Sequence, residues 1–134
     1  MQVFEQAGLP YLAPELRSSP DALSRFNPAL IVEEDIRGVV HAHSTYSDGI
    51  HTLQEMAESA RTSGFDYLVI TDHSKSAFYA NGLSAERVFS QMAEVEALNA
   101  AMAPFRIFKG IESDILADGS LDYPEEILSQ FEVV

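Results

Sequence analysis

The sequence contains no cysteine among its 134 residues, so it can form neither a disulfide nor a thiolate metal site. Any bound metal would be held by imidazole and carboxylate groups, which suit zinc, manganese and iron. Long apolar runs are also missing: no stretch of about 18 apolar residues predicts a transmembrane helix, and the first residues do not resemble a signal peptide. We therefore expect a cytoplasmic protein with no membrane partner.

Basic residues are scarce, because 8 Lys and Arg stand against 21 Asp and Glu, for a formal net charge of −13. This balance disfavours nucleic-acid binding through a broad basic surface, since phosphate contacts need clustered Lys and Arg. Two interpretations remain: a solvated acidic surface, or carboxylates gathered where divalent cations bind. A phosphodiester substrate would have to be attracted by metal ions or by another domain.

Proline divides the chain into two regions. Four of the six prolines lie in residues 1–34, which excludes a long helix or a central strand there. Short apolar pieces lie between these prolines, so we expect a connector that packs along a neighbouring surface. Residues 35–134 alternate predicted strands with predicted helices and form the second expected domain.

The second region predicts an α/β fold of parallel strands with helical crossovers. Helices are expected to begin at Thr52, where Glu55 completes a capping box, at Ser84, and near Pro124. Strands are predicted at residues 36–42, 67–71, 106–111 and 131–134. Four strands do not close a barrel, and the last run is strand-like. We therefore expect a piece of a longer protein, which would self-associate through the exposed edge of its fourth strand.

Ligand-type side chains follow each of the first three predicted strands. His41 and His43 end the first strand, where alternate residues share a side and would form a chelating pair. Asp48 lies in the Ser-Asp-Gly turn that follows, His73 ends the second strand and Glu112 ends the third. The carboxyl ends of parallel strands are where α/β folds bind ligands. We therefore predict that these five residues form part of a polynuclear metal site.

Each of these motifs alone has a plainer interpretation, such as a packed histidine pair or a salt-bridged acid at Glu112. Their joint placement at successive strand ends favours the metal site. Asp72 would point to the opposite side of its strand, so we expect it to orient a ligand or hold a neighbouring loop by hydrogen bonds. Asp114 is expected to be structural or to support a ligand, and His51 to be exposed to solvent.

Three motifs resemble the first motifs of the polymerase and histidinol phosphatase (PHP) family of metal-dependent phosphoesterases. They are His-x-His-Ser-x-x-Ser-Asp-Gly at 41–49, Ile-Thr-Asp-His-Ser at 70–74 and Lys-Gly-Ile-Glu at 109–112. The resemblance implies a distorted (β/α)7 barrel, of which this chain would be an incomplete portion. It also implies three divalent-metal sites in the intact domain, filled by manganese, zinc or iron.

The resemblance assigns a role to each predicted ligand. His41 and His43 would bind one metal, Glu112 would bridge two metals, and Asp48 and His73 would bind the third. No catalytic residue beyond these ligands is expected, because a metal-activated water would be the nucleophile. The family's remaining ligands would lie beyond residue 134, so the chain alone is expected to be inactive.

The first region and two short segments of the second indicate which subgroup of the PHP family the chain resembles. Residues 8–17 and 35–38 resemble the connector between the polymerase and PHP domains of bacterial family X DNA polymerases, and residues 115–122 also resemble that subgroup. Residues 1–34 would then follow a polymerase domain located upstream in the same protein. Residues 35–134 would be the N-terminal part of a PHP domain that acts on DNA as a manganese-dependent 3′–5′ exonuclease in repair.

Two alternatives remain open at this point. One is a stand-alone PHP phosphatase of the histidinol-phosphatase type, which acts on a small phosphomonoester. The other is a non-catalytic PHP module that stabilises a polymerase.

Overall fold

A computed structural model describes residues 2–17 and 30–134 of the chain, which forms two compact units, Met1–Asp35 and Ile36–Val134. The first unit contains the short helix α1 (Gln2–Gln6) and the 3₁₀ turns η1 (Pro14–Leu16) and η2 (Glu33–Asp35). Residues 18–29 of the expected connector lie outside the described residues. None of the helices in residues 2–17 and 30–134 could span a lipid bilayer.

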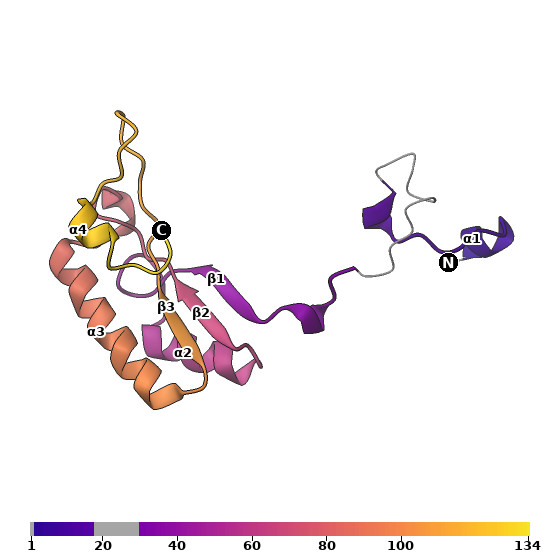
Figure 1. Cartoon of the computed structure of the whole chain (residues 1–134), viewed down its shortest axis with the longest axis horizontal. Coiled ribbons are helices and arrows are strands. Elements are labelled where there is room, and N and C mark those ends of the chain that lie inside the picture. The colour runs from indigo at the N-terminus through magenta and orange to yellow at the C-terminus, as the bar shows by residue number, and fades with distance from the viewer. Residues whose placement is uncertain (1, 18–29) are drawn as a thin grey trace. The chain divides into compact units, whose positions relative to one another are not determined.

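The second unit is built on a parallel three-stranded sheet in the order β1-β2-β3 (Figure 1). Its strands are β1 (Gly38–Ala42), β2 (Tyr67–Ile70) and β3 (Arg106–Lys109). Its helices are α2 (Leu53–Thr62), α3 (Ala85–Met102) and α4 (Glu125–Leu128), with the 3₁₀ turn η3 (Phe78–Ala80) before α3. The predicted α/β fold of parallel strands with helical crossovers is confirmed.

The fourth predicted strand is shorter than expected. Its only ladder contact in the described chain is a single parallel bridge between Gly110 and Val133. The Ile111 N–H donates to the Val133 carbonyl at 3.1 Å. The segment therefore follows the edge of β3 without forming a regular strand.

The two long helices begin where their capping residues predict. At the start of α2 the Glu55 N–H donates to Thr52 Oγ1 at 3.2 Å, and the Thr52 N–H donates to Glu55 Oε2 at 2.8 Å. This is the predicted capping box. Ser84 caps α3 by accepting a hydrogen bond from the Arg87 N–H.

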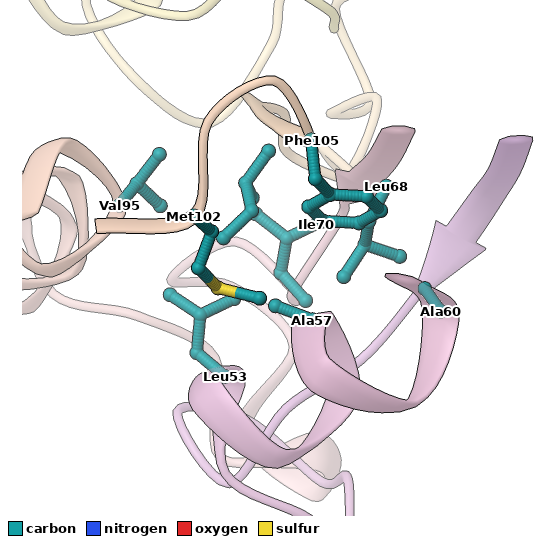
Figure 2. Close-up of a cluster of buried hydrophobic side chains, with 9 residues drawn as sticks. Leu53, Ala57, Ala60, Leu68, Ile70, Val95, Met102 and Phe105 are labelled. Carbon is teal, nitrogen blue, oxygen red and sulfur yellow. The ribbon is translucent and has the colours of Figure 1, made fainter. Parts of the chain in front are cut away.

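The main hydrophobic core lies between the sheet and the helices α2 and α3 (Figure 2). Leu53 and Ala57 of α2 meet Ile70 of β2, together with Met102 at the end of α3 and Phe105 in the turn after it, and all five are buried. Burial of a Leu or Ile side chain contributes about 1.5–3 kcal/mol. This packing fixes both helices on one face of the sheet, and therefore also fixes the loops that connect them to the carboxyl ends of the strands.

A second cluster of buried side chains lies beside the first half of α3. It joins Val88 and Met92 of α3 to Leu83, Ile111 and Tyr123. The Tyr123 hydroxyl donates to the Leu83 carbonyl, and burial raises the pKa of Tyr123 to about 12. The loops that follow β2 and β3 are thus packed against each other.

Candidate functional site

His41 and His43 lie at the end of β1, but strand alternation is not what brings them together. The register of β1 against β2 shifts between Val39 and Ala42, and His41 has a φ of 67°. Such an irregularity re-aims a side chain at the edge of a sheet. β1 ends at Ala42, and the two imidazole rings stack with their centroids 5.3 Å apart and an interplanar angle of 16°.

Glu112 brings the first group of possible ligands together. Its Oε2 atom lies 3.2 Å from His41 Nε2 and 3.0 Å from His43 Nε2. The Glu112 N–H donates to the Asp72 carbonyl at 3.1 Å, and Glu112 forms a parallel bridge with His73. The backbone therefore aligns the residue after β3 with the residue after β2.

Asp48 and His73 form the second group together with His43. Asp48 Oδ1 lies 2.9 Å from His43 Nδ1, and Asp48 Oδ2 lies 3.6 Å from His73 Nε2. The rings of His43 and His73 meet edge to face, with centroids 4.4 Å apart. The structure thus places all five predicted residues in one cluster at the carboxyl edge of the sheet. His43 belongs to both groups of three whose ligand atoms lie within 4.8 Å of one another.

The geometry between His43 and Glu112 fits a cation. His43 Nε2 and Glu112 Oε2 are buried, lie 3.0 Å apart, and have no hydrogen-bond partner in the described part of the chain. When His43 Nδ1–H donates to Asp48, Nε2 carries a lone pair that faces a carboxylate lone pair. Two buried acceptors in this arrangement are unfavourable, because each leaves a desolvated polar atom without a donor. A divalent cation would satisfy both atoms, and imidazole and carboxylate suit zinc, manganese and iron.

Asp48 is held in its ionised form at this site. Its hydrogen bond with His43 keeps the pKa of Asp48 below its usual value, which outweighs the opposing effect of burial. Coulombic interactions with His73 and His43 also lower the pKa of Asp48. Asp48 Oδ1 is therefore engaged with His43, whereas Oδ2 faces His73.

Asp72 lies beneath the loop that follows β1. Its buried carboxylate accepts hydrogen bonds from the backbone N–H groups and the hydroxyls of Ser44 and Ser47. The side-chain amide of Gln91 donates to it at 2.5 Å. The sequence predicted that Asp72 would either orient a ligand or hold a neighbouring loop, and these bonds agree with the second alternative and identify the loop after β1.

Two further titratable residues lie outside both groups. The His51 side chain is 64% exposed, and its Nδ1 lies 4.0 Å from Glu55 Oε2, so its predicted exposure is confirmed. Asp114 accepts a hydrogen bond from the Ser76 hydroxyl at 2.7 Å, and its own N–H donates to Ser74 Oγ at 3.0 Å. Asp114 therefore has a structural role, which is one of the two roles expected for it from the sequence.

Sequence reasoning missed two residues that position the site loops. The Arg87 guanidinium donates to the Tyr46 carbonyl and, at 3.1 Å, to the Asn81 carbonyl, so it ties together the loops after β1 and β2. Gln91 is 2% exposed and binds Asp72. Gln91 could have been found from the sequence, because it is a polar residue on the otherwise apolar face of α3. Arg87 could not, because an arginine in the first turn of a helix does not indicate a role in a site.

Comparison with known proteins agrees with this geometry. Residues 40–132 match the model of the PHP domain. The chain is 42% identical to the DNA polymerase/3′-5′ exonuclease PolX of Bacillus subtilis over 135 residues, which cover 99% of this chain and 24% of that protein. It is 33% identical to a probable phosphatase of Acetivibrio thermocellus over 99 residues, which cover 70% of this chain and 37% of that protein. The chain therefore spans well under half the length of either relative.

Proposed function

The chain belongs to the PHP domain family of phosphoesterases, and on that premise we propose that it is part of a metal-dependent exonuclease that hydrolyses DNA from its 3′ end. The observation that carries the proposal is the cluster in which His43 is shared by two groups of possible ligands. The similarity to PolX supports DNA as the substrate, because it covers 99% of the chain, including the region before Ile36.

We propose His41, His43 and Glu112 as one set of metal ligands, and His73 with Asp48 as the core of another. Divalent cations held there would supply Lewis-acid stabilisation of a phosphoryl group and lower the pKa of the attacking water. Manganese, zinc and iron all suit this set of nitrogen and oxygen donors. The family resemblance implies three such sites in the intact domain.

The protein's own residues prepare this site for binding. Asp48 Oδ1 accepts from His43 Nδ1 and thereby directs the lone pair of Nε2 at Glu112. The hydroxyls of Ser44 and Ser47 are committed to Asp72, so neither is available as a nucleophile. The proposal therefore needs no covalent intermediate with the protein.

For the region before the catalytic domain, we propose that residues 1–34 are the connector from a polymerase domain in the same protein. The first compact unit, Met1–Asp35, contains only short helical elements in its described part. Residues 35–134 would then be the N-terminal part of the PHP domain. The polymerase domain, rather than this acidic region, would supply the main contacts to DNA phosphates.

A second candidate function is hydrolysis of a small phosphomonoester. It is favoured by the 33% identity to the probable phosphatase of Acetivibrio thermocellus. The two functions differ in substrate, because a phosphatase would release phosphate from β-glycerophosphate, whereas an exonuclease would shorten a DNA strand. A non-catalytic module that stabilises a polymerase would do neither.

The test compares two histidine variants. The assay uses the full-length protein, with the polymerase domain and the whole PHP domain, in the presence of Mn²⁺. We expect the wild type to shorten a 5′-labelled single-stranded oligonucleotide from its 3′ end and to release little phosphate from β-glycerophosphate. His43→Ala should lower the rate by more than about tenfold, because it removes a ligand of the first group and the hydrogen-bond partner of Asp48 in the second. His51→Ala is the matched control and should retain the wild-type rate, since His51 lies outside both groups.

The outcomes separate the candidates. Equal rates in His43→Ala and the wild type would contradict the metal-site proposal. Phosphate release without shortening of the strand would favour the phosphatase. Neither reaction, despite bound Mn²⁺, would favour the non-catalytic module.

A further inference from the structure

Two large aromatic side chains stand exposed on the turn η3, in the loop after β2. Phe78 is 88% exposed and Tyr79 is 84% exposed, whereas the flanking Ala77 and Ala80 are 0% and 2% exposed. The turn therefore buries its small residues and presents its aromatic rings to solvent. Exposed aromatic residues next to each other in a fixed turn are typical of a surface that binds another molecule.

The turn that carries these rings is held in place. The N–H groups of Ala80 and Gly82 both donate to the Ala77 carbonyl at 3.0 Å, and the Ser76 N–H donates to Asp122 Oδ2 at 2.8 Å. Leu83 N–H donates to the His73 carbonyl at 2.9 Å and closes the loop. A ligand that binds here loses little free energy to ordering of the turn.

The turn adjoins the candidate metal site. The centroids of the Tyr79 and His73 rings lie 6.0 Å apart at an interplanar angle of 64°. His73 Nε2 in turn lies 3.6 Å from Asp48 Oδ2. A planar group stacked on the aromatic pair would therefore lie beside the point where the proposed phosphoester is hydrolysed.

Charge on the protein indicates what kind of group would be bound. The net charge is −13, and three basic residues of the described chain, Arg37, Arg106 and Lys109, are each paired with a carboxylate. Because 21 acidic residues stand against 8 basic ones, few cations are present to contact phosphate groups. Stacking of bases on aromatic side chains does not depend on positive charge and tolerates any base sequence.

We propose that Phe78 and Tyr79 form a stacking platform for the nucleobases at the 3′ end of single-stranded DNA, which rests on the exonuclease function proposed above. The platform would hold the base while the adjacent cluster acts on its phosphodiester. Exposure, rigidity and contact with His73 together support this role.

The test compares two strands of equal length and charge, one with bases and one without. The probes are a strand of ten thymidine nucleotides and an abasic strand of the same length, both 5′-labelled and both with phosphorothioate linkages that slow hydrolysis. Binding is measured in the presence of Mn²⁺ at a fixed salt concentration. Fluorescence anisotropy measures their dissociation constants with the intact protein. We expect the wild type to bind the thymidine strand about tenfold or more tightly than the abasic strand.

Two variants show whether the aromatic pair causes this preference. Phe78→Leu/Tyr79→Leu keeps the apolar character of both positions but removes the rings, and should bind both strands equally. Phe89→Leu is the matched control, because Phe89 is another exposed aromatic residue, 52% exposed, on α3. It should keep the wild-type preference, and circular dichroism checks that both variants fold.

Two results would contradict the platform: equal affinity of the wild type for the two strands, or a double variant that still binds the thymidine strand more tightly than the abasic strand. Failure of the platform is distinguishable from failure of the exonuclease. If the double variant retains base preference while the wild type shortens DNA and His43→Ala does not, the platform is wrong and the exonuclease stands. If the wild type shows base preference but no hydrolysis of unmodified DNA, the exonuclease is wrong and the platform describes binding alone.

Discussion

A single buried carboxylate, Asp72, organises the loop that follows β1. Its side chain is fully buried, and its two oxygens accept five hydrogen bonds from Ser44, Ser47 and Gln91 at 2.5–3.2 Å. Burial of a carboxylate costs several kcal/mol unless its lone pairs are satisfied. Because five donors satisfy them here, Asp72 fixes a loop that carries part of the candidate site without itself belonging to either group of ligands.

The substitution Asp72→Asn tests this role. It replaces one acceptor oxygen by an NH₂ group that faces other donors, so we expect the free energy of unfolding to fall by about 2–3 kcal/mol. We also expect the affinity for Mn²⁺ to fall about tenfold or more, because the loop that positions His43 and Asp48 is loosened. Urea denaturation and calorimetric titration of the chain measure the two effects.

The matched control is Asp66→Asn, which removes an exposed carboxylate paired with Arg37. It should change the free energy of unfolding by less than about 1 kcal/mol and leave the affinity for Mn²⁺ unchanged. An Asp72→Asn protein with wild-type affinity for Mn²⁺ would show that the loop does not depend on Asp72.

The residues of the cluster could be predicted from the sequence, because each follows an apolar run that ends at the same edge of a parallel sheet. The conformation of His41 could not. Its positive φ lies within the irregular pairing of β1 with β2, which depends on two segments that are distant in the sequence. The bonds of Ser47 and Gln91 to Asp72 are likewise set by how the loop lies against α3.

Among the elements, the loops after β2 and β3 are joined by a polar cluster around Asp122. Its carboxylate accepts from the Ser76 N–H at 2.8 Å and from the Ser113 hydroxyl at 2.8 Å. The Ser76 hydroxyl lies within hydrogen-bond distance of both Asp114 and Asp122. These contacts hold together the two loops that supply His73 and Glu112.

This cluster makes stability depend on pH. Burial raises the pKa of Asp122, but hydrogen bonds from the Ser76 N–H and from the hydroxyls of Ser74, Ser76 and Ser113 outweigh it and lower the pKa overall. The resulting stabilisation is fully present above the unfolded pKa of about 4 and is lost as pH falls through the lower folded value. We expect Asp122→Asn to be less stable at pH 7 and to lose less further stability below about pH 4.

Urea denaturation across this pH range measures the effect. Wild-type and Asp122→Asn curves that decline in parallel below about pH 4 would contradict the assignment, because the difference between them should shrink as Asp122 becomes protonated.

The starts of α2 and α3 were predictable because the capping residues Thr52 and Ser84 act locally. The last segment was less predictable, since an apolar run at residues 131–134 is compatible with a strand. Whether it forms a ladder depends on its alignment with β3, and in the structure the alignment gives only the bridge at Val133.

For the whole molecule, the acidic composition and the candidate site are related. The five cluster residues bring three imidazoles and two carboxylates together, and bound cations would offset the negative charge of the two carboxylates. The sequence predicted the parallel α/β class from the alternation of elements, and it predicted the family from three motifs. It could not predict the aromatic pair on η3, because exposure depends on which residues of that turn pack against the core.

The most direct test of the account is anomalous X-ray diffraction from crystals of the protein grown with Mn²⁺. We predict anomalous peaks at the group of His41, His43 and Glu112 and at the group of His43, Asp48 and His73. Crystals of His43→Ala grown in the same way should lose both peaks or show them strongly reduced. Full Mn²⁺ loading elsewhere on the surface, with no peak at either group, would contradict the account.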